Sequence, residues 1–258
     1  MSRTVTDTAG PADRRWQDFF RHPDYPTFAH ATLPPERTAA ETAAVRRILG
    51  LRPTTRVLDL GCGYGRISVP LARAGMEVTG LDAVPELLER ARGAAAAAGV
   101  RLELIHSAMR DLDAVERFDA VVNLSTALGY VPDEADDAAA LAAVYRALVP
   151  GGRLLIDTEN REATLRKARR TWYEVAGATV WCRRSFAPMT GRWTETIDWL
   201  SDTGRGGSAF SLRLYALTEL RSMLEGAGFL VEQAWGGLDQ TPYECDSPRM
   251  VVLARRPA

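Results

Sequence analysis

The chain has 258 residues, a formal net charge of -1, 46% hydrophobic residues and 25% charged residues. These values are typical of a globular protein with a full core, and the length suits one large domain or a domain with an insertion. No run of about 18 uncharged apolar residues occurs, which predicts no transmembrane helix, and the near-neutral charge argues against a dedicated nucleic-acid binder.

The N-terminal segment predicts a loose tail followed by a helical cover. Residues 1–15 are polar and lack the apolar segment of a signal peptide, so we expect a cytoplasmic protein. The short aromatic stretch 16–20 and several prolines follow. Pro35 predicts the first turn of a helix that runs to Leu49 and ends at Gly50, because proline suits a first helical turn and glycine the residue after a helix.

Strands and helices then alternate. Apolar stretches predict strands at 56–59, 77–81, 101–105, 120–124 and 153–157. Helices are predicted between them at 67–74, 85–98 and 136–148, and Pro150-Gly151-Gly152 predicts a turn before the fifth strand. Strands joined by helices imply an α/β fold with a doubly wound, mostly parallel sheet of the Rossmann-like kind.

The pattern changes after the fifth strand. Stretches rich in aromatic and β-branched residues predict an antiparallel meander with strands at 179–186, 192–200 and 209–215 and turns at 190–191 and 202–207. A helix at 218–227, capped by Thr218, and strands at 230–235 and 250–254 complete the α/β sheet. The meander is therefore predicted to be an antiparallel β insertion in that sheet.

The turn after the first strand is the strongest functional signal. It reads Asp59-Leu60-Gly61-Cys62-Gly63-Tyr64-Gly65, and glycines let a backbone approach a ligand closely at the edge where doubly wound sheets bind ligands. A dinucleotide fingerprint requires glycine at position 66, which is Arg66, so pyrophosphate binding is disfavoured. Asp59 instead suits a cationic ligand, although it could merely brace the loop.

A second carboxylate, Asp82, ends the second strand. Its two oxygens can accept hydrogen bonds from both hydroxyls of a ribose. The alternative role is an N-cap for the helix that follows. Cys62 is interpreted as a small loop residue rather than a nucleophile.

These residues resemble the class I S-adenosylmethionine-dependent methyltransferases. The loop from Asp59 to Gly65 matches the first motif of that family, Asp82 matches its ribose-binding acid, and residues 148–152 match its turn before strand five. The similarity covers residues 16–256 and is greatest to a bacterial small-molecule branch with an antiparallel insertion after strand five. It implies S-adenosyl-L-methionine as cofactor and four parts: a tail and helical cover (1–50), a cofactor-binding core (51–160), an antiparallel lid (161–215) and the rest of the core (216–258).

The resemblance also implies a map of the cofactor site. Gly61, Cys62 and Gly63 pass beneath the methionine part, and Asp82 holds the ribose. The adenine lies near Ala83, Met109 and Arg110, where Ala108 replaces an aspartate of many relatives, and strand four ends beneath the methyl group at Asn123 and Leu124. Arg37 resembles the arginine that pairs with the cofactor carboxylate, and Tyr25 closes the same end. The alternatives are a surface cation for Arg37 and a core aromatic for Tyr25.

Methyl transfer from a sulfonium is an in-line displacement, so the enzyme mainly aligns the acceptor and excludes water. A general base is needed only when the acceptor must lose a proton by the time of attack. The sequence leaves that base open among His30, Tyr130, Asp157, Glu159 and Tyr215. The histidines are scattered and the three cysteines lack CxxC spacing, so we expect no metal site and no disulfide framework.

We therefore expect N- or O-methylation of a small metabolite or natural-product intermediate in the bacterial cytoplasm, with neither a nucleic acid nor a membrane as partner. The alternative is a cyclase or isomerase that keeps the cofactor as a structural or electrostatic element. The arginine-rich segment 161–170 is interpreted as a solvated helix face, and the alternative is a surface that attracts an anionic acceptor or phosphate. The aromatic residues of the insertion are interpreted as meander core or as contacts of a homo-oligomer, and the alternative for some of them is the wall of an apolar acceptor pocket.

Overall fold

The computed structural model describes residues 15–22, 25, 32–202 and 204–258. Its helices are α1 (Arg15–Arg21), α3 (Pro35–Leu49), α4 (Ser68–Arg73), α5 (Pro85–Ala97), α6 (Glu134–Ala147), α7 (Arg161–Thr164) and α8 (Leu217–Gly226), with a 3-10 turn η1 at Met109–Asp111. Its strands are β1 (Arg56–Leu60), β2 (Glu77–Asp82), β3 (Glu103–His106), β4 (Phe118–Asn123), β5 (Leu148–Glu159), β6 (Arg170–Val175), β7 (Ala178–Ala187), β8 (Arg192–Ser201), β9 (Gly204–Arg213), β10 (Leu230–Trp235) and β11 (Arg249–Arg255). Within these residues no helix is long and apolar enough to cross a membrane.

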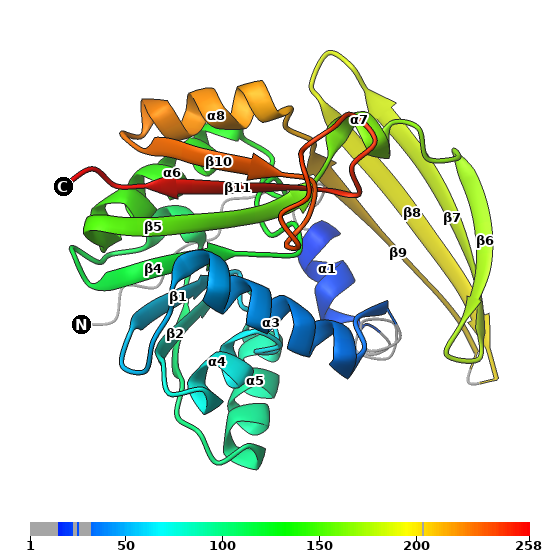
Figure 1. Ribbon diagram of the computed structural model, residues 1–258. Helices are drawn as coiled ribbons and strands as arrows, with labels where there is room; N and C mark the ends of the chain where they lie inside the picture. The colour runs from blue at the N-terminus through cyan, green and yellow to red at the C-terminus, as the bar shows by residue number, and fades with distance from the viewer. Residues whose placement is uncertain (1–14, 23–24, 26–31, 203) are drawn as a thin grey trace, which may run out of the picture.

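The main sheet has seven strands in the order β10-β11-β5-β4-β1-β2-β3. Strands β1 to β5 are parallel, and β11 runs antiparallel to β5 (Figure 1). Alternate residues of β1 point to opposite faces, so Val57 packs with α3 and α4 while Leu58 packs with α6 and α8. Helices cover both faces, and the predicted doubly wound, mostly parallel fold is confirmed.

The second sheet is antiparallel, with the order β6-β7-β8-β9, and it follows β5 in the chain as predicted. It stands beside the carboxyl edge of the parallel strands (Figure 1). Arg192 of β8 donates to the backbone carbonyls of Tyr130 and Val131 in the loop after β4, at 3.5 and 3.1 Å. On its inner side, Phe210 of β9 packs against Phe19 of α1 with ring centroids 5.1 Å apart. The division into four parts stays a prediction.

Several element boundaries differ from the predictions. The first strand of the meander, β6, was missed, and α7 is a single turn rather than a helix face over 161–170. Strand β9 begins at Gly204, inside the predicted turn. Thr218 does not cap α8: the helix starts after Ala216, whose N–H donates to the Glu219 carboxylate. The turn at 150–152 lies inside β5, where the pairing with β4 shifts register.

Candidate functional site

The glycine loop leaves β1 at the point where the strand order reverses. The N–H groups of Gly61 and Cys62 both donate to the Leu81 carbonyl, at 2.7 and 3.0 Å, which ties the loop to β2. Gly61 and Gly63 have φ angles of 80° and 54°, a conformation that favours glycine. A Cβ atom on Gly61 would lie 2.6 Å from the Cβ of Ala127, whereas one on Gly63 would meet nothing within 4 Å. The loop is therefore tightly packed at Gly61 and borders open space at Gly63.

Two buried carboxylates lie under this loop. Asp82 accepts the N–H of Gly63 at 2.8 Å and the N–H of Val84 at 2.9 Å, so it braces both the loop and the approach to α5. Asp59 accepts the hydroxyl of Ser68 at 2.5 Å. Burial raises the pKa of both groups, that of Asp59 to about 6. The loop is thus backed by negative charge, an environment that favours a cationic ligand over a pyrophosphate.

The raised pKa of Asp59 predicts an unusual dependence of stability on pH. Its ordinary value is 3.8, so between about pH 4 and pH 6 the folded protein keeps a proton that the unfolded chain releases. The contribution of Asp59 to the free energy of unfolding should therefore decrease by about 2 kcal/mol as the pH rises through this window. The measurement is the difference in unfolding free energy between wild type and Asp59→Asn at several pH values.

Asp119→Asn is the matched control for that experiment. Asp119 pairs with Arg56, and the hydrogen bonds from Arg56 lower its pKa although partial burial opposes this. Its contribution should be constant above about pH 4 and be lost only below it. Parallel stability curves for wild type and Asp59→Asn between pH 4 and 7 would contradict the assignment.

The end of β4 forms the floor beside the glycine loop. The Asn123 amide is 2% exposed and donates to the Leu60 carbonyl at 2.8 Å. Its Oδ1 atom is buried and accepts no hydrogen bond, although buried polar atoms usually have a partner. Met109 lies against the same floor, because its methyl group would be 2.9 Å from a Cβ on Gly61. Gly61, Met109 and Asn123, which the resemblance placed in one site, are therefore neighbours.

An ion-pair cluster that the sequence did not reveal borders the loop on the other side. Arg66, whose side chain is 10% exposed, pairs with Glu41 of α3 at 2.5 Å and donates to the hydroxyl of Ser125 at 2.7 Å. Arg37 pairs with the same Glu41 at 2.7 Å but is half exposed. Despite burial, the two arginines lower the pKa of Glu41. One carboxylate thus serves two guanidinium groups, which leaves an excess positive charge next to the loop.

The candidate bases on β5 are not free. Asp157 pairs with Arg249 at 2.7 Å through one oxygen and accepts the N–H of Ser125 at 3.0 Å with the other. Glu159 pairs with Arg249 and Lys167 at 2.9 and 2.7 Å, and these cations lower its pKa although burial opposes this.

The candidate base Tyr215 is engaged as well. Its hydroxyl donates to Asp137 at 2.8 Å, and burial, followed by the Asp137 charge, raises its pKa. His30 lies outside the described residues.

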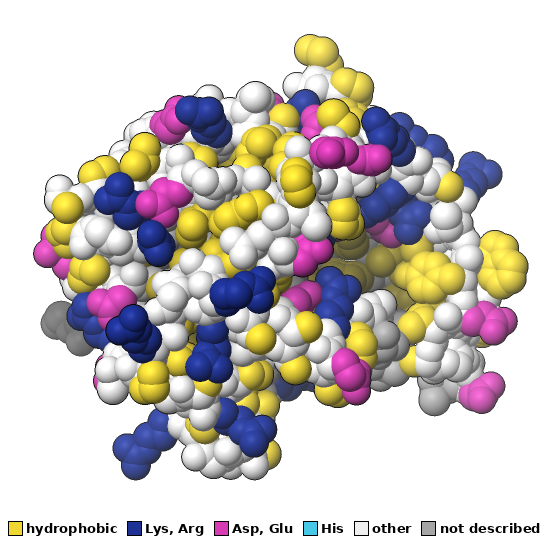
Figure 2. All heavy atoms as spheres, in the orientation of Figure 1, with side chains coloured by type: hydrophobic (Ala, Val, Ile, Leu, Met, Phe, Trp, Pro, Cys, Tyr) yellow, Lys and Arg dark blue, Asp and Glu magenta, His cyan; other side chains and the backbone are white. Residues whose placement is uncertain are grey.

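Aromatic side chains converge between α1, the loop after β4 and the antiparallel sheet. Neighbouring ring centroids lie 5.1 to 6.2 Å apart in a cluster made of Trp16, Phe19, Phe20, Tyr25, Tyr130 and Phe210. Figure 2 shows a hollow between the body and this sheet, with hydrophobic side chains in its depth and charged ones on its rim. Burial raises the pKa of the Tyr25 and Tyr130 phenols, which therefore stay protonated at neutral pH.

The remaining predicted residues lie around the loop. Cys62 is 6% exposed and packs against Gly80, so it is a small packing residue, and burial raises the pKa of its thiol. Leu124 is buried, and Ala83 is partly buried. Arg110 is exposed and pairs with Asp136 of α6. Among the residues that the structure describes, no group of three or more His, Cys, Asp or Glu could hold a metal ion.

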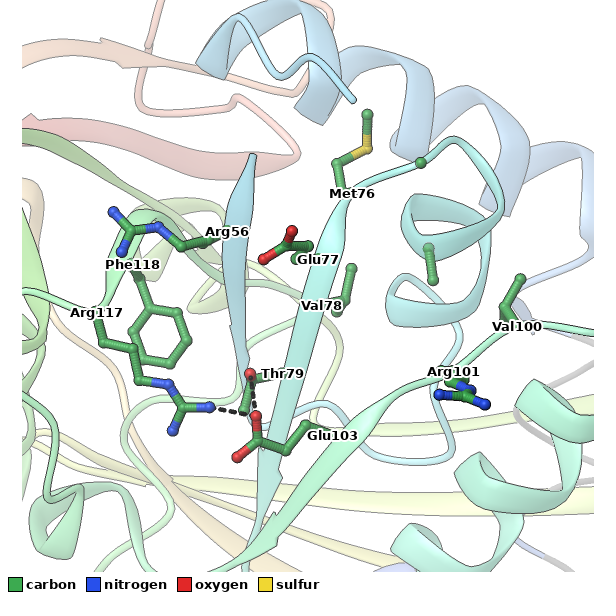
Figure 3. A pocket seen from close by; sticks show the side chains of 12 residues that line it. Arg56, Met76, Glu77, Val78, Thr79, Val100, Arg101, Glu103, Arg117 and Phe118 are labelled. Atoms are coloured by element: carbon green, nitrogen blue, oxygen red, sulfur yellow. Dashed lines mark hydrogen bonds and ion pairs between the residues drawn. The ribbon is translucent and has the colours of Figure 1, made fainter. Parts of the chain in front are cut away.

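A cavity of about 560 Å³ lies elsewhere, at the amino ends of β1 to β3 (Figure 3). Glu103 at its wall already holds Arg117 and accepts the hydroxyl of Thr79 at 3.3 Å. The amino ends of parallel strands face away from the loops that follow their carboxyl ends. This cavity is therefore separate from the candidate site.

Comparison with known proteins assigns the part of the chain that carries this site. Residues 57–152, from β1 into β5, match the methyltransferase domain family. These residues form a class I methyltransferase domain. The ubiquinone biosynthesis O-methyltransferase of Xylella fastidiosa is 43% identical over 108 residues, which are 41% of this chain and 42% of that relative. The chain thus matches less than half the length of this curated relative.

Solved structures of methyltransferases resemble this chain over more than the methyltransferase domain, because the matched part also includes the antiparallel insertion. The CcbJ methyltransferase of Streptomyces caelestis has a TM-score of 0.76 and 22% identity, over 86% of this chain and 96% of that one. CalS10, an amino pentose methyltransferase from Micromonospora echinaspora solved with SAM bound, has a TM-score of 0.65 and 25% identity, over 86% and 90% of the two chains. The methyltransferase domain and its antiparallel sheet are thus found together in solved structures.

Proposed function

We propose that this chain is an S-adenosylmethionine-dependent methyltransferase that acts on an amine of a small molecule. Four features support the cofactor: open space over Gly63, the acids Asp59 and Asp82, and the unpaired buried oxygen of Asn123. The Asp82 carboxylate has about four lone-pair positions, and two of them accept backbone N–H groups. The others can accept hydrogen bonds from ribose hydroxyls. When bound, S-adenosylmethionine supplies an activated methyl group on a sulfonium.

The cofactor carboxylate would be held by the cluster around Glu41. We assign the direct contact to Arg66, because it borders both the glycine loop and Ser125 and its guanidinium is largely buried. Arg37, the arginine suggested by family resemblance, is half exposed and shares Glu41, so it would support Arg66 from behind. Tyr25 would close this end, since its phenol is near Tyr64 and Asp82.

Arg66→Met should weaken S-adenosylmethionine binding about tenfold or more, because a charge-assisted ion pair with the carboxylate is lost. Calorimetry with 5′-methylthioadenosine, which lacks the amino acid part, should give nearly unchanged affinity. Arg37→Met should have a smaller effect on the intact cofactor. Equal losses for both ligands in Arg66→Met would show that the residue acts on the loop and not on the carboxylate.

We assign the acceptor as an amine because none of the candidate bases that the structure describes is free to accept a proton. Both oxygens of Asp157 and both oxygens of Glu159 are engaged by cations or hydrogen-bond donors. The phenols near the hollow have raised pKa values, so they are poor bases at neutral pH. An amine attacks with its lone pair and can release its proton after transfer, so it needs none of these groups as a base.

The aromatic cluster suits the same acceptor. Attack by a neutral amine creates an ammonium ion, and the faces of aromatic rings attract such cations. The rings of Tyr130 and Phe210, which join the loop after β4 to the antiparallel sheet, have centroids 5.8 Å apart. We propose that this sheet completes the acceptor pocket as a lid and that alignment, rather than proton abstraction, dominates the rate.

A paired substrate screen tests this function. The protein is incubated with S-adenosylmethionine and with amines, including amino sugars, each matched by the hydroxyl compound of the same skeleton. We expect S-adenosylhomocysteine and a singly methylated product with amines only. Methylation of the hydroxyl partners alone would overturn the choice of acceptor. Conversion of an acceptor without release of S-adenosylhomocysteine would favour a cyclase or isomerase.

A further inference from the structure

Two consecutive residues after β4 have an unfavourable backbone conformation. Ser125 and Thr126 have φ angles of 56° and 62°, in the left-handed region. This region is especially unfavourable for a β-branched residue such as Thr126, and such strain persists only where surrounding contacts enforce it. The contacts of these two residues therefore identify the groups that hold the backbone in this conformation.

Three side chains hold this strained turn. Asp157 accepts the N–H of Ser125 with its carboxylate at 3.0 Å and the N–H of Thr126 with its backbone carbonyl at 2.9 Å. Arg66 donates to the hydroxyl of Ser125, and Arg249 donates through Nη2 to the hydroxyl of Thr126 at 2.8 Å. Of the three, Arg249 comes from β11, far from the glycine loop in sequence.

The guanidinium of Arg249 is itself fixed on three sides. Its Nε donates to Asp157 at 2.7 Å, its Nη1 to Glu159 at 2.9 Å and its Nη2 to Thr126. The antiparallel register of β11 and β5 sets Arg249 opposite Glu159 and near Asp157. A planar guanidinium can serve three acceptors at once in a fixed geometry, which a single ammonium nitrogen cannot match.

The strained turn abuts the cofactor loop. The Cβ of Ala127, the next residue, occupies the place that a side chain on Gly61 would need. On the other side of the turn, Asn123 donates to the Leu60 carbonyl, directly before Gly61. A shift of the turn therefore displaces the glycine loop. We propose that Arg249 is a positioning residue for the cofactor site, which it orders by holding Ser125 and Thr126 in the left-handed conformation.

This inference rests on the proposed function for its binding readout, and a double-mutant cycle tests it. Arg249→Met should weaken binding of S-adenosylhomocysteine about tenfold, the scale of losing a hydrogen bond from a charged group. Thr126→Gly added to that variant should recover most of the affinity, because glycine adopts positive φ without support. A role of Arg249 limited to neutralising Asp157 predicts no recovery. That result would overturn the proposal.

Further variants keep the test decisive. Arg255→Met is the matched control, since Arg255 lies on the same strand and pairs with Glu232 at 2.8 Å, and its affinity should equal that of wild type. If Arg249→Met does not fold, Arg249→Lys keeps the charge near Asp157 but should still weaken binding and be rescued by Thr126→Gly.

Amide exchange of the ligand-free proteins separates this inference from the function. Exchange at residues 125–128 should be faster in the Arg249 variant and return toward wild type in the double variant. Unchanged exchange would overturn the positioning role. Failure of wild type to bind either cofactor form would instead overturn the proposed function.

Discussion

Asp82→Ala should weaken binding of S-adenosylmethionine by about 1–3 kcal/mol, or about 5- to 150-fold, the scale of losing charge-assisted hydrogen bonds. Asp82 is 9% exposed and holds the N–H groups of Gly63 and Val84. Its loss removes the acceptor that we assign to the ribose hydroxyls and also frees the N–H of Gly63. The first change removes a contact of the bound state and the second loosens the loop of the free protein, so both should lower the affinity measured by calorimetric titration.

Asp119→Ala controls for the loss of a carboxylate from the same sheet. Asp119 accepts the backbone N–H of Arg56 at 2.8 Å, as Asp82 accepts that of Gly63, but it lies at the amino end of the strands. This variant should lose stability and keep its affinity for the cofactor. Asp82→Asn keeps the shape of the side chain but turns one acceptor into a donor, so it should also bind poorly. Unchanged affinity in Asp82→Ala would refute the cofactor map.

Much of the fold could be predicted because its signals are local. Helix α3 spans Pro35–Leu49 and ends at Gly50 with φ 65°, as proline and glycine at those positions indicated. The glycine loop follows β1 and Asp82 ends β2, so the loop and the carboxylate lie at the same carboxyl edge of the parallel sheet. The cap of α8 was misplaced because the helix already begins at Leu217, after Ala216, so Thr218 lies inside its first turn.

The missed features depend on contacts distant in sequence. Arg66 and Glu41 are 25 positions apart on different elements, and Arg249 lies 92 positions from Asp157. Nothing in either local sequence shows that these charges meet, because strand order and register decide it. The carboxylates on β5 were identified as candidate bases from their position at the carboxyl edge. Their ion pairs, visible only in the structure, favour a supporting role.

Strand β6 could not be predicted from the hydrophobic periodicity of the sequence. Its six residues do not alternate between apolar and polar types, they continue an arginine-rich stretch, and all six are at least partly exposed on an edge strand. An exposed edge strand lacks the apolar alternation that marks a half-buried strand. Only its pairing with β7, from Arg170 opposite Arg183 to Val175 opposite Ala178, defines it.

Alanine at Gly61 should mainly lower the stability of the protein, whereas alanine at Gly63 should mainly weaken cofactor binding. Both positions have positive φ, so either substitution should lower the free energy of unfolding by about 1–2 kcal/mol through backbone strain. At Gly61 the new Cβ would also lie 2.6 Å from Ala127 and 2.9 Å from Met109. This overpacking adds about 1–3 kcal/mol, for a total near 2–5 kcal/mol. At Gly63 the Cβ meets no protein atom within 4 Å, so strain is the whole loss.

Cofactor binding, in contrast to stability, should be affected more strongly by Gly63→Ala than by Gly61→Ala. The space above Gly63 is where the proposed cofactor passes, so a methyl group there should reduce the affinity for S-adenosylhomocysteine about tenfold or more. Chemical denaturation then ranks Gly61→Ala as the less stable variant, while titration ranks Gly63→Ala as the poorer binder relative to its stability. If Gly63→Ala binds as tightly as wild type, the ligand does not pass over that residue. The open space beside Gly63 would then have to serve another group.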